Sequence, residues 1–300
     1  MTGIRLKRRK HAAARPNRPA RRSHTRGARR PRTPRRRALP RLASLGRIGA
    51  GLLAALLGAG LIAILNGPWL HVSELAWAGE RLTPSADLAR LLEPARGNNL
   101  LSLDTRALVA RVERLPAVER AVVSAQIPGR LALSVTEKAP AFIWQTRSLR
   151  LIGAADGAMI GALPPGKALP PDLARLPFVD DRREAARLTG VGDVIPGPML
   201  QIANYLARLD PALLGSKASR LSIRLDDEYG FIVVSSAPAW QAAFGFYGLE
   251  PSDPGQSEGP YDRIEKQVAA VRTLFATEPE TGVSCVDARN PGKVYFRANR

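Results

Sequence analysis

Several segments of this 300-residue chain carry residue types and spacings that serve catalysis elsewhere, but none completes an active site. Residues 161–168 follow most of the P-loop pattern, but Pro164 and Pro165 remove two backbone N–H groups that a phosphate site needs. Residues 255–259 match a nucleophile elbow around Ser257, yet they lie between two prolines instead of between a strand and a helix. Both matches are therefore interpreted as loops.

The other candidate side chains do not indicate catalysis either. All three histidines lie at or before residue 71, which leaves the rest of the chain without a histidine for a triad or a zinc site. No lysine follows a serine by three residues, so the Ser-x-x-Lys nucleophile is absent. Cys285, the only cysteine, lies in a valine-rich segment typical of an inert buried thiol, and the acidic run 226–228 is typical of a solvated hairpin tip. We expect no enzyme, cofactor or metal site, and core positions for Trp144 and Trp240.

The charge of the chain is concentrated at one end. Lys and Arg number 45 against 26 Asp and Glu, and 18 of these basic residues, with no acidic one, lie within residues 1–47. The remainder is nearly neutral, so the high pI does not indicate a nucleic-acid-binding protein. We expect residues 1–47 to be a disordered basic cytoplasmic tail that contacts anionic lipid headgroups. The alternatives for the tail are contact with DNA and contact with an unknown cytoplasmic partner. Lipid contact is favoured over both, so no nucleic-acid partner is expected.

A membrane segment follows the tail. Residues 48–73 carry no charged side chain and residues 48–65 are unbroken apolar sequence. Eighteen helical residues rise about 27 Å, close to the hydrocarbon thickness of a bilayer. Trp69 lies where an interfacial aromatic belongs. We expect a transmembrane helix over residues 48–70, with the N-terminus in the cytoplasm because the basic flank lies wholly on that side, and an extracytoplasmic remainder.

A cleaved signal peptide is the main alternative for this segment. Residues 76–78, Ala-Trp-Ala, fit a small-x-small cleavage pattern, but they lie beyond the apolar run and inside a predicted strand. A twin-arginine signal around residues 35–37 is a weak match, because arginine is abundant throughout the tail. A permanent anchor is the favoured interpretation.

The elements beyond the membrane segment fall into two groups. Residues 72–77 read as a strand, and a helix follows with Thr83 as its N-cap and Pro84 at its first position. Asp104 is predicted to cap a second helix, and strands over residues 118–127 and 131–135 flank a Pro128-Gly129 turn. From residue 140 on, strands are predicted within 142–152, 219–225, 231–235, 283–287 and 294–296, helices over 198–209 and 264–275, and a loop without periodicity over 249–260.

These segments resemble a known family. The strings LTPSADL, GNNLLSLD and LPAVERAVVSAQIPGRLALSVTEKAPAFIW, followed by AADGAMI and the closing VDARNPGKVYFRA, resemble the FtsQ/DivIB cell-division family in their order and spacing. Ala117 departs from the family, which often has Trp there. The resemblance implies an α+β chain with a POTRA domain (β-α-α-β-β) over residues 71–139 and, over residues 140–300, a mainly antiparallel FtsQ-type β domain with flanking helices.

The same resemblance implies a function without catalysis. It would be a bitopic scaffold of the bacterial divisome that binds small coiled-coil division proteins of the FtsB/DivIC and FtsL type and supports septum formation. A POTRA module of a secretion or outer-membrane assembly system is the alternative. That class would carry several POTRA repeats and a long series of amphipathic barrel strands, and one POTRA unit is seen here.

The predicted partner site is the closing strand. Alternation places Val294 and Phe296 on one face, packed inward, and Tyr295 on the other face, open to a partner. Alternatively, Tyr295 covers the domain's own helix. The resemblance places the family's partner site around this segment, which gives the candidate residues Asn290, Lys293, Val294, Tyr295 and Arg297.

Overall fold

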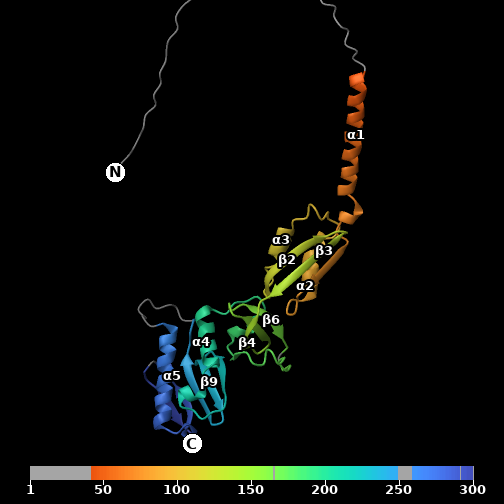
Figure 1. Ribbon diagram of the computed structural model, residues 1–300. Helices are drawn as coiled ribbons and strands as arrows, with labels where there is room; N and C mark the ends of the chain where they lie inside the picture. The colour runs from red at the N-terminus through yellow and green to blue at the C-terminus, as the bar shows by residue number, and fades with distance from the viewer. Residues whose placement is uncertain (1–41, 165, 249–258, 291, 300) are drawn as a thin grey trace, which may run out of the picture. The chain divides into compact units, whose positions relative to one another are not determined.

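The computed structural model of the chain describes residues 42–164, 166–248, 259–290 and 292–299 (Figure 1). The chain divides into two compact units, residues 1–58 and residues 59–300. Nearly all of the predicted basic tail and most of the 249–260 loop lie outside the described residues.

The first described element is the long apolar helix α1, Leu42–Leu65. It begins at Leu42, six residues before the predicted start at residue 48. Its stretch from Arg47 to Leu65 is long and apolar enough to cross a membrane. The side chains there are almost all exposed, as expected of a helix whose apolar surface needs a bilayer. The helix ends before the 3₁₀ turn η1, Pro68–Leu70.

A small α+β domain follows, in the predicted β-α-α-β-β order. Its elements are β1 (Glu74–Ala78), α2 (Ser85–Leu92), α3 (Thr105–Val112), β2 (Val118–Gln126) and β3 (Arg130–Glu137), with the short η2 (Glu93–Ala95) after α2. The sheet order is β1-β3-β2, with β1 parallel and β2 antiparallel to β3. Leu88 and Leu92 of α2 and Leu108 and Val112 of α3 are buried in one core with the strands. Because the Ala-Trp-Ala tripeptide lies inside β1, cleavage there would cut a paired strand.

Of the two predicted helix N-caps in this domain, one is confirmed and one is wrong. Asp104 caps α3 as predicted, since its carboxylate accepts the N–H of Ala107. The prediction for Thr83 was wrong, because Pro84 occupies the extended N-cap position of α2 and provides no side-chain cap. The segment before α2 is held instead by Glu137, whose carboxylate accepts the backbone N–H groups of Arg81, Leu82 and Thr83.

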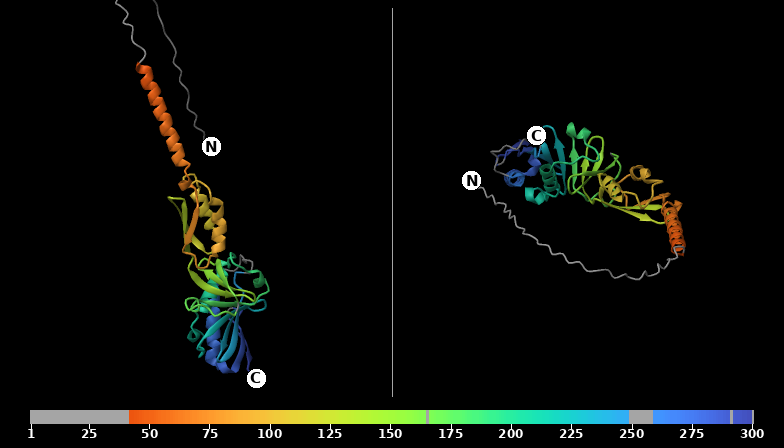
Figure 2. Two further views of the ribbon diagram at one scale, coloured as in Figure 1. Left: turned by 90° about the vertical axis from the view of Figure 1, so that its right-hand side faces the viewer. Right: turned by 90° about the horizontal axis from the view of Figure 1, so that it is seen from above.

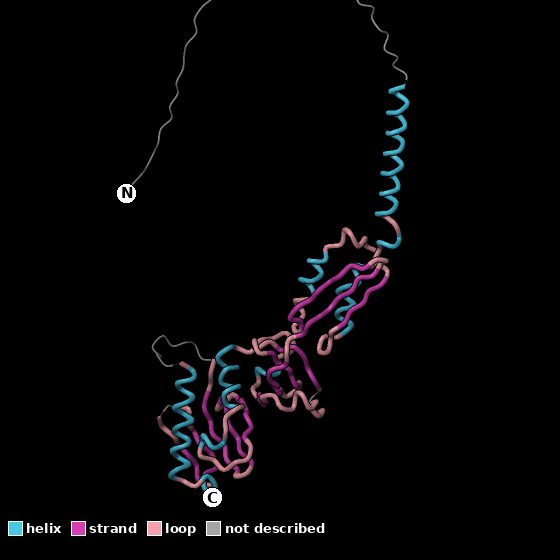
Figure 3. The backbone as a smooth tube through the Cα atoms, viewed as in Figure 1, coloured by secondary structure: helices cyan, strands magenta, loops and turns pink. Residues whose placement is uncertain are grey.

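The second domain is built on one nine-stranded sheet, drawn as magenta tube segments in Figure 3. The strand order is β12-β11-β10-β9-β8-β7-β4-β5-β6. Antiparallel pairs predominate, and β4–β7, β7–β8 and β10–β11 are parallel. The strands are β4 (Pro140–Gln145), β5 (Arg150–Ala154), β6 (Met159–Leu163), β7 (Phe178–Asp181), β8 (Leu221–Asp226), β9 (Gly230–Ser236), β10 (Ala239–Gly245), β11 (Val283–Asp287) and β12 (Tyr295–Ala298).

Two helices pack on this sheet, α4 (Gly197–Ala207) and α5 (Pro260–Thr277), seen beside the strands in Figures 1 and 2. The short helices η3 (Ala185–Leu188), η4 (Pro211–Leu214) and η5 (Glu280–Gly282) complete the domain. Both helices contribute side chains to a large apolar core with the strands. Trp144 and Trp240 are buried in it as predicted. The strands β7 and β10 were not predicted.

Buried carboxylates satisfy the polar atoms of these tryptophans. The indole N–H of Trp144 donates to Asp181, which also binds the guanidinium of Arg183 at 2.7 Å. The indole of Trp240 donates to Glu280, which also accepts the hydroxyl of Ser216. A buried polar group without a partner would destabilise the core, so these contacts stabilise the packing of β4 with β7 and of β10 with η5.

The last strand of the first domain runs almost directly into the second. β3 ends at Glu137 and β4 begins at Pro140, so two residues join them. The first of these, Lys138, makes a 2.7 Å ion pair with Asp156 in the β5–β6 turn. Ala117, where the family often has Trp, is buried in a small cluster with residues of β4, β5 and β6.

Candidate partner-binding edge

The closing strand β12 lies at one end of the nine-stranded sheet. It pairs on one side with β11, where Val286 lies opposite Phe296 and Asp287 opposite Tyr295. On its other side no described strand follows, so the order ends at β12. An edge strand presents unpaired backbone N–H and C=O groups to its surroundings. The predicted open edge is therefore present in the structure.

The five predicted site residues surround this strand. Asn290, Lys293, Tyr295 and Arg297 are exposed, and Val294 is half-buried against the core. Tyr295 is 60% exposed and lies opposite Asp287, in a register that alternates with the buried Val286. Facing residues of paired strands lie on the same face of the sheet, so Tyr295 shares a face with Asp287. Val286, the neighbour of Asp287, points to the opposite face, toward the core. The alternative in which Tyr295 covers α5 is not supported.

The prediction that Phe296 packs inward was wrong. Phe296 lies opposite Val286, which is fully buried, yet 45% of Phe296 is exposed. Helix α5 packs on β10, α4 and η4, and Val283 and Val286 of β11 belong to the same apolar core. Phe296, on the terminal strand, is not part of that core. Phe296 thus joins the exposed edge, and alternation alone could not show this.

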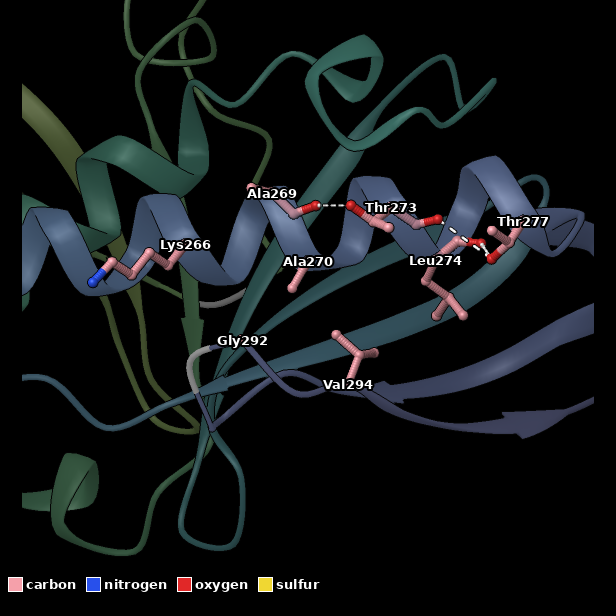
Figure 4. Close-up of a pocket in the computed structure, with 8 residues that line it drawn as sticks. All are labelled: Lys266, Ala269, Ala270, Thr273, Leu274, Thr277, Gly292 and Val294. Carbon is pink, nitrogen blue, oxygen red and sulfur yellow. Dashed lines mark hydrogen bonds between the residues drawn. The ribbon is translucent and has the colours of Figure 1, made fainter.

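A groove lies between α5 and the segment that leads into β12. Its volume is about 670 Å³, and Figure 4 shows Val294 and Gly292 facing the helix across it. The helical wall is made mostly of small side chains, namely Ala269, Ala270, Thr273, Leu274 and Thr277 together with Lys266. The hydroxyls of Thr273 and Thr277 donate to carbonyls of their own helix. The wall therefore presents mainly methyl groups, which suit an apolar side chain.

The charges near the edge are unevenly paired. Asp287 of β11 makes a bidentate contact with Arg289, at 2.7 Å from Oδ2 to the guanidinium. This hydrogen bond from Arg289 lowers the pKa of Asp287 against the opposing effect of partial burial. Lys293 and Arg297, in contrast, make no ion pair within the described part of the chain. The edge thus offers two cations to a partner.

The motifs that resemble chemistry do not form sites in the described residues. Gly161 of the P-loop match lies in β6, while Ser257 of the elbow match lies outside the described residues. Asp226 accepts the backbone N–H groups of Glu228 and Tyr229, so it stabilises the hairpin turn. Across the described ranges, no group of three His, Cys, Asp or Glu side chains lies close enough to hold a metal ion.

Comparison with known proteins agrees with the geometry. The family model described as "POTRA domain, FtsQ-type" matches residues 70–138. Cell division protein FtsQ of Anaeromyxobacter sp. (strain K) is 29% identical over 204 residues, which cover 65% of each chain. Cell division protein FtsQ of Mycobacteroides abscessus is 26% identical over 177 residues, 59% of this chain and 54% of that protein. The protein of the same name from Streptomyces collinus is 32% identical over 95 residues, 31% of this chain and 36% of that protein.

The elements between residues 70 and 138, with the mixed sheet that follows, define an α+β protein that carries an FtsQ-type POTRA domain. Matched segments span less than two thirds of the length of the first two relatives. The chain therefore carries an FtsQ-type POTRA domain and is similar, over about 60% of its length, to proteins named cell division protein FtsQ.

Proposed function

We propose that the chain is a non-enzymatic, bitopic scaffold of the bacterial division machinery. Helix α1 anchors it in the cytoplasmic membrane, the basic tail remains in the cytoplasm near anionic headgroups, and the rest is extracytoplasmic. The nine-stranded domain binds small coiled-coil division proteins of the FtsB/DivIC and FtsL type and thereby supports septum formation. The names of the relatives and the lack of histidine after residue 71 support this proposal.

The observation that carries the proposal is the open edge of β12. A partner segment that pairs with Tyr295–Ala298 extends the sheet by one strand and satisfies its free backbone groups. Main-chain pairing supplies affinity with little sequence preference, so side chains must supply specificity. Tyr295 and Phe296, on opposite faces of the strand, are the exposed aromatic candidates for that role.

The groove between α5 and the segment before β12 adds a second recognition element. A partner strand on β12 brings every second side chain to the α5 side of the sheet. The methyl-lined wall near Thr273 and Thr277 suits small apolar side chains there. Lys293 and Arg297 favour acidic residues next to the paired segment. The expected partner segment is therefore extended, apolar on one face and acidic at its ends.

The test is capture of a purified FtsB/DivIC-type protein from the same organism by the full chain in detergent. Tyr295→Ala removes an exposed aromatic and should weaken binding about tenfold or more. Val294→Pro removes a backbone donor beside the edge and should weaken binding to a similar extent. Tyr261→Ala is the matched control, since Tyr261 is also exposed but lies in the first turn of α5, away from the edge.

Circular dichroism and urea unfolding must show that each variant is folded. If both edge variants are folded and bind as tightly as the unmodified chain, the partner site lies elsewhere. If Tyr261→Ala weakens binding as much as Tyr295→Ala does, the effect is not specific to the edge.

A further inference from the structure

Three large apolar side chains are exposed near the place where the chain leaves α1. They are Trp69, Leu101 and Ile127, with exposed fractions of 46%, 64% and 69%. Each belongs to a different segment, namely η1, the loop before α3 and the β2–β3 turn. A single exposed apolar residue is ordinary, but three that converge at one end of a domain indicate a contact surface. We call these three residues the apolar rim.

Hydrogen bonds hold the rim segments around the end of α1. The side-chain amide of Asn99 donates to the carbonyl of Leu65, the last residue of the helix, at 2.7 Å. Asn99 also forms a β-bridge with His71, and the carbonyl of Gly129 accepts the N–H of Ser73 at 2.8 Å. Leu101 and Ile127 are each two residues from these contacts. Figure 3 shows the loop and the turn at the same end of the POTRA sheet.

The indole of Trp69 is positioned by its own turn. A Cβ atom at Gly67 would collide with the ring, so the ring lies directly on the backbone that follows α1. Trp69 therefore remains beside the end of the helix, where a tryptophan at a membrane–water boundary is favoured.

The polar groups of the loop before α3 have internal partners. The N–H of Leu101 and the hydroxyl of Ser102 are bonded to Asn99, and the N–H of Leu100 donates to Leu70 at 2.7 Å. The side chain of Asn98 donates to Pro94. Polar groups that are already bonded cost less to remove from water, so this loop is suited to an environment poor in water.

Two arginines next to the rim are paired with acids. Arg96 makes an ion pair with Glu93 at 2.9 Å, and Arg130 makes one with Glu74 at 3.4 Å. These pairs carry no net charge, so they give no preference for anionic lipid and are compatible with a zwitterionic headgroup layer.

We propose that the apolar rim inserts into the outer leaflet of the membrane that α1 spans, so that the POTRA domain rests on the lipid surface. This inference rests on the proposed anchoring of α1. Leu65 ends the apolar stretch and therefore lies near the hydrocarbon boundary, and groups bonded to it lie at the same depth. Amphipathic surfaces that bury apolar side chains at this depth bind the interface.

The experiment uses the full chain in phosphatidylcholine proteoliposomes. In a Cys285→Ser background, Leu101→Cys and Ile127→Cys each receive an environment-sensitive fluorophore. Both labels should show blue-shifted emission and should be quenched by lipids that carry a quencher at shallow depth. Leu188→Cys is the matched control, because Leu188 is an exposed leucine of the second domain at 89% exposure and should show neither effect.

A further label, Leu57→Cys within α1, distinguishes the membrane anchoring of α1 from the insertion of the apolar rim. If position 57 is quenched from deep in the bilayer while 101 and 127 behave like 188, the anchor is right and the rim inference is wrong. If position 57 also fails to report lipid, the anchor itself is wrong and the inference falls with it. Blue-shifted emission at 101 and 127 without quenching by lipid means that a second copy of the chain covers the rim, which also overturns the inference.

Discussion

The buried ion pair between Asp181 and Arg183 allows a quantitative prediction with an internal control. Asp181 is 1% exposed, and its two oxygens bind the Arg183 guanidinium at 2.9 and 2.7 Å and the Trp144 indole at 2.9 Å. Asp181→Asn keeps the size but leaves the charge of Arg183, itself only 9% exposed, without a counter-charge. Removal of one partner of a buried pair costs about 3–5 kcal/mol. Because asparagine keeps one acceptor, we expect the low end, about 3 kcal/mol.

The neighbouring pair provides the control. Asp180 and Arg182 are also 2.7 Å apart, but their side chains are 29% and 56% exposed. Exposed pairs contribute about 0–1 kcal/mol, so Asp180→Asn should change the stability by less than 1 kcal/mol. The two variants make the same chemical change one residue apart, on opposite faces of β7.

The assay is urea unfolding of the full chain in detergent, followed by tryptophan fluorescence and circular dichroism. With a urea dependence of about 2–3 kcal/mol per M, Asp181→Asn should lower the midpoint by about 1 M or more, and Asp180→Asn by a few tenths. Equal shifts for the two variants would refute the reasoning. The double variant Asp181→Leu/Arg183→Met removes both charges together, so it should recover much of the loss.

Two further predictions concern acid and topology. Partial burial raises the pKa of Glu137, but hydrogen bonds from the backbone N–H groups of residues 81–83 outweigh this effect and lower the pKa below its ordinary value. A carboxylate whose pKa is lowered in the folded state stabilises the fold at pH values above its pKa in the unfolded chain. The POTRA domain should therefore lose stability as the pH falls below about 4.5. Glu137→Gln should flatten this dependence relative to the exposed Glu119→Gln, as measured by thermal unfolding across pH. In spheroplasts, external protease should digest the chain beyond about residue 71 and spare the tail. Neutral substitutions of the 18 tail charges should weaken the orientation with the N-terminus in the cytoplasm. A soluble form that begins near residue 80 would instead support cleavage of a signal peptide.

The secondary-structure elements that have local sequence signals could be predicted from the sequence alone. Asp104 precedes an apolar run at helical spacing, and Pro128-Gly129 separates two alternating strands, so α3 and the β2–β3 hairpin were predicted. Cap and turn preferences act over a few residues and are visible in the chain itself. Thr83 shows the limit of such signals, because a distant carboxylate at residue 137 holds the segment that a local cap was expected to hold.

The missed strands lack a local signal. β7 has only four residues and half of them are aspartates, and its neighbours β4 and β8 pair with it in parallel across long stretches of sequence. β10 contains three alanines, which favour strands weakly. Both strands form because they complete the sheet over a buried core, which is a tertiary effect.

The candidate edge was predicted in part. The exposure of Tyr295 followed from alternation, but the exposure of Phe296 depends on the terminal strand lying outside the apolar core, which is a tertiary effect. The methyl-lined wall of the groove was not predicted either. Thr273 and Thr277, with the alanine at 269, recur at helical spacing, but their role depends on Gly292 and Val294 lying across the groove from them.

The two-residue connection between β3 and β4 has a mechanical consequence. Two extended residues span about 7 Å, so Lys138 and Ala139 provide almost no slack. A pull along the axis of a strand paired with β12 would load the hydrogen bonds between the two strands in shear, so that these bonds share the force. That tension would pass through the sheet into β4 and across the short joint into β3. The short joint would then transmit the force between the two domains with little extension, unlike a long flexible linker.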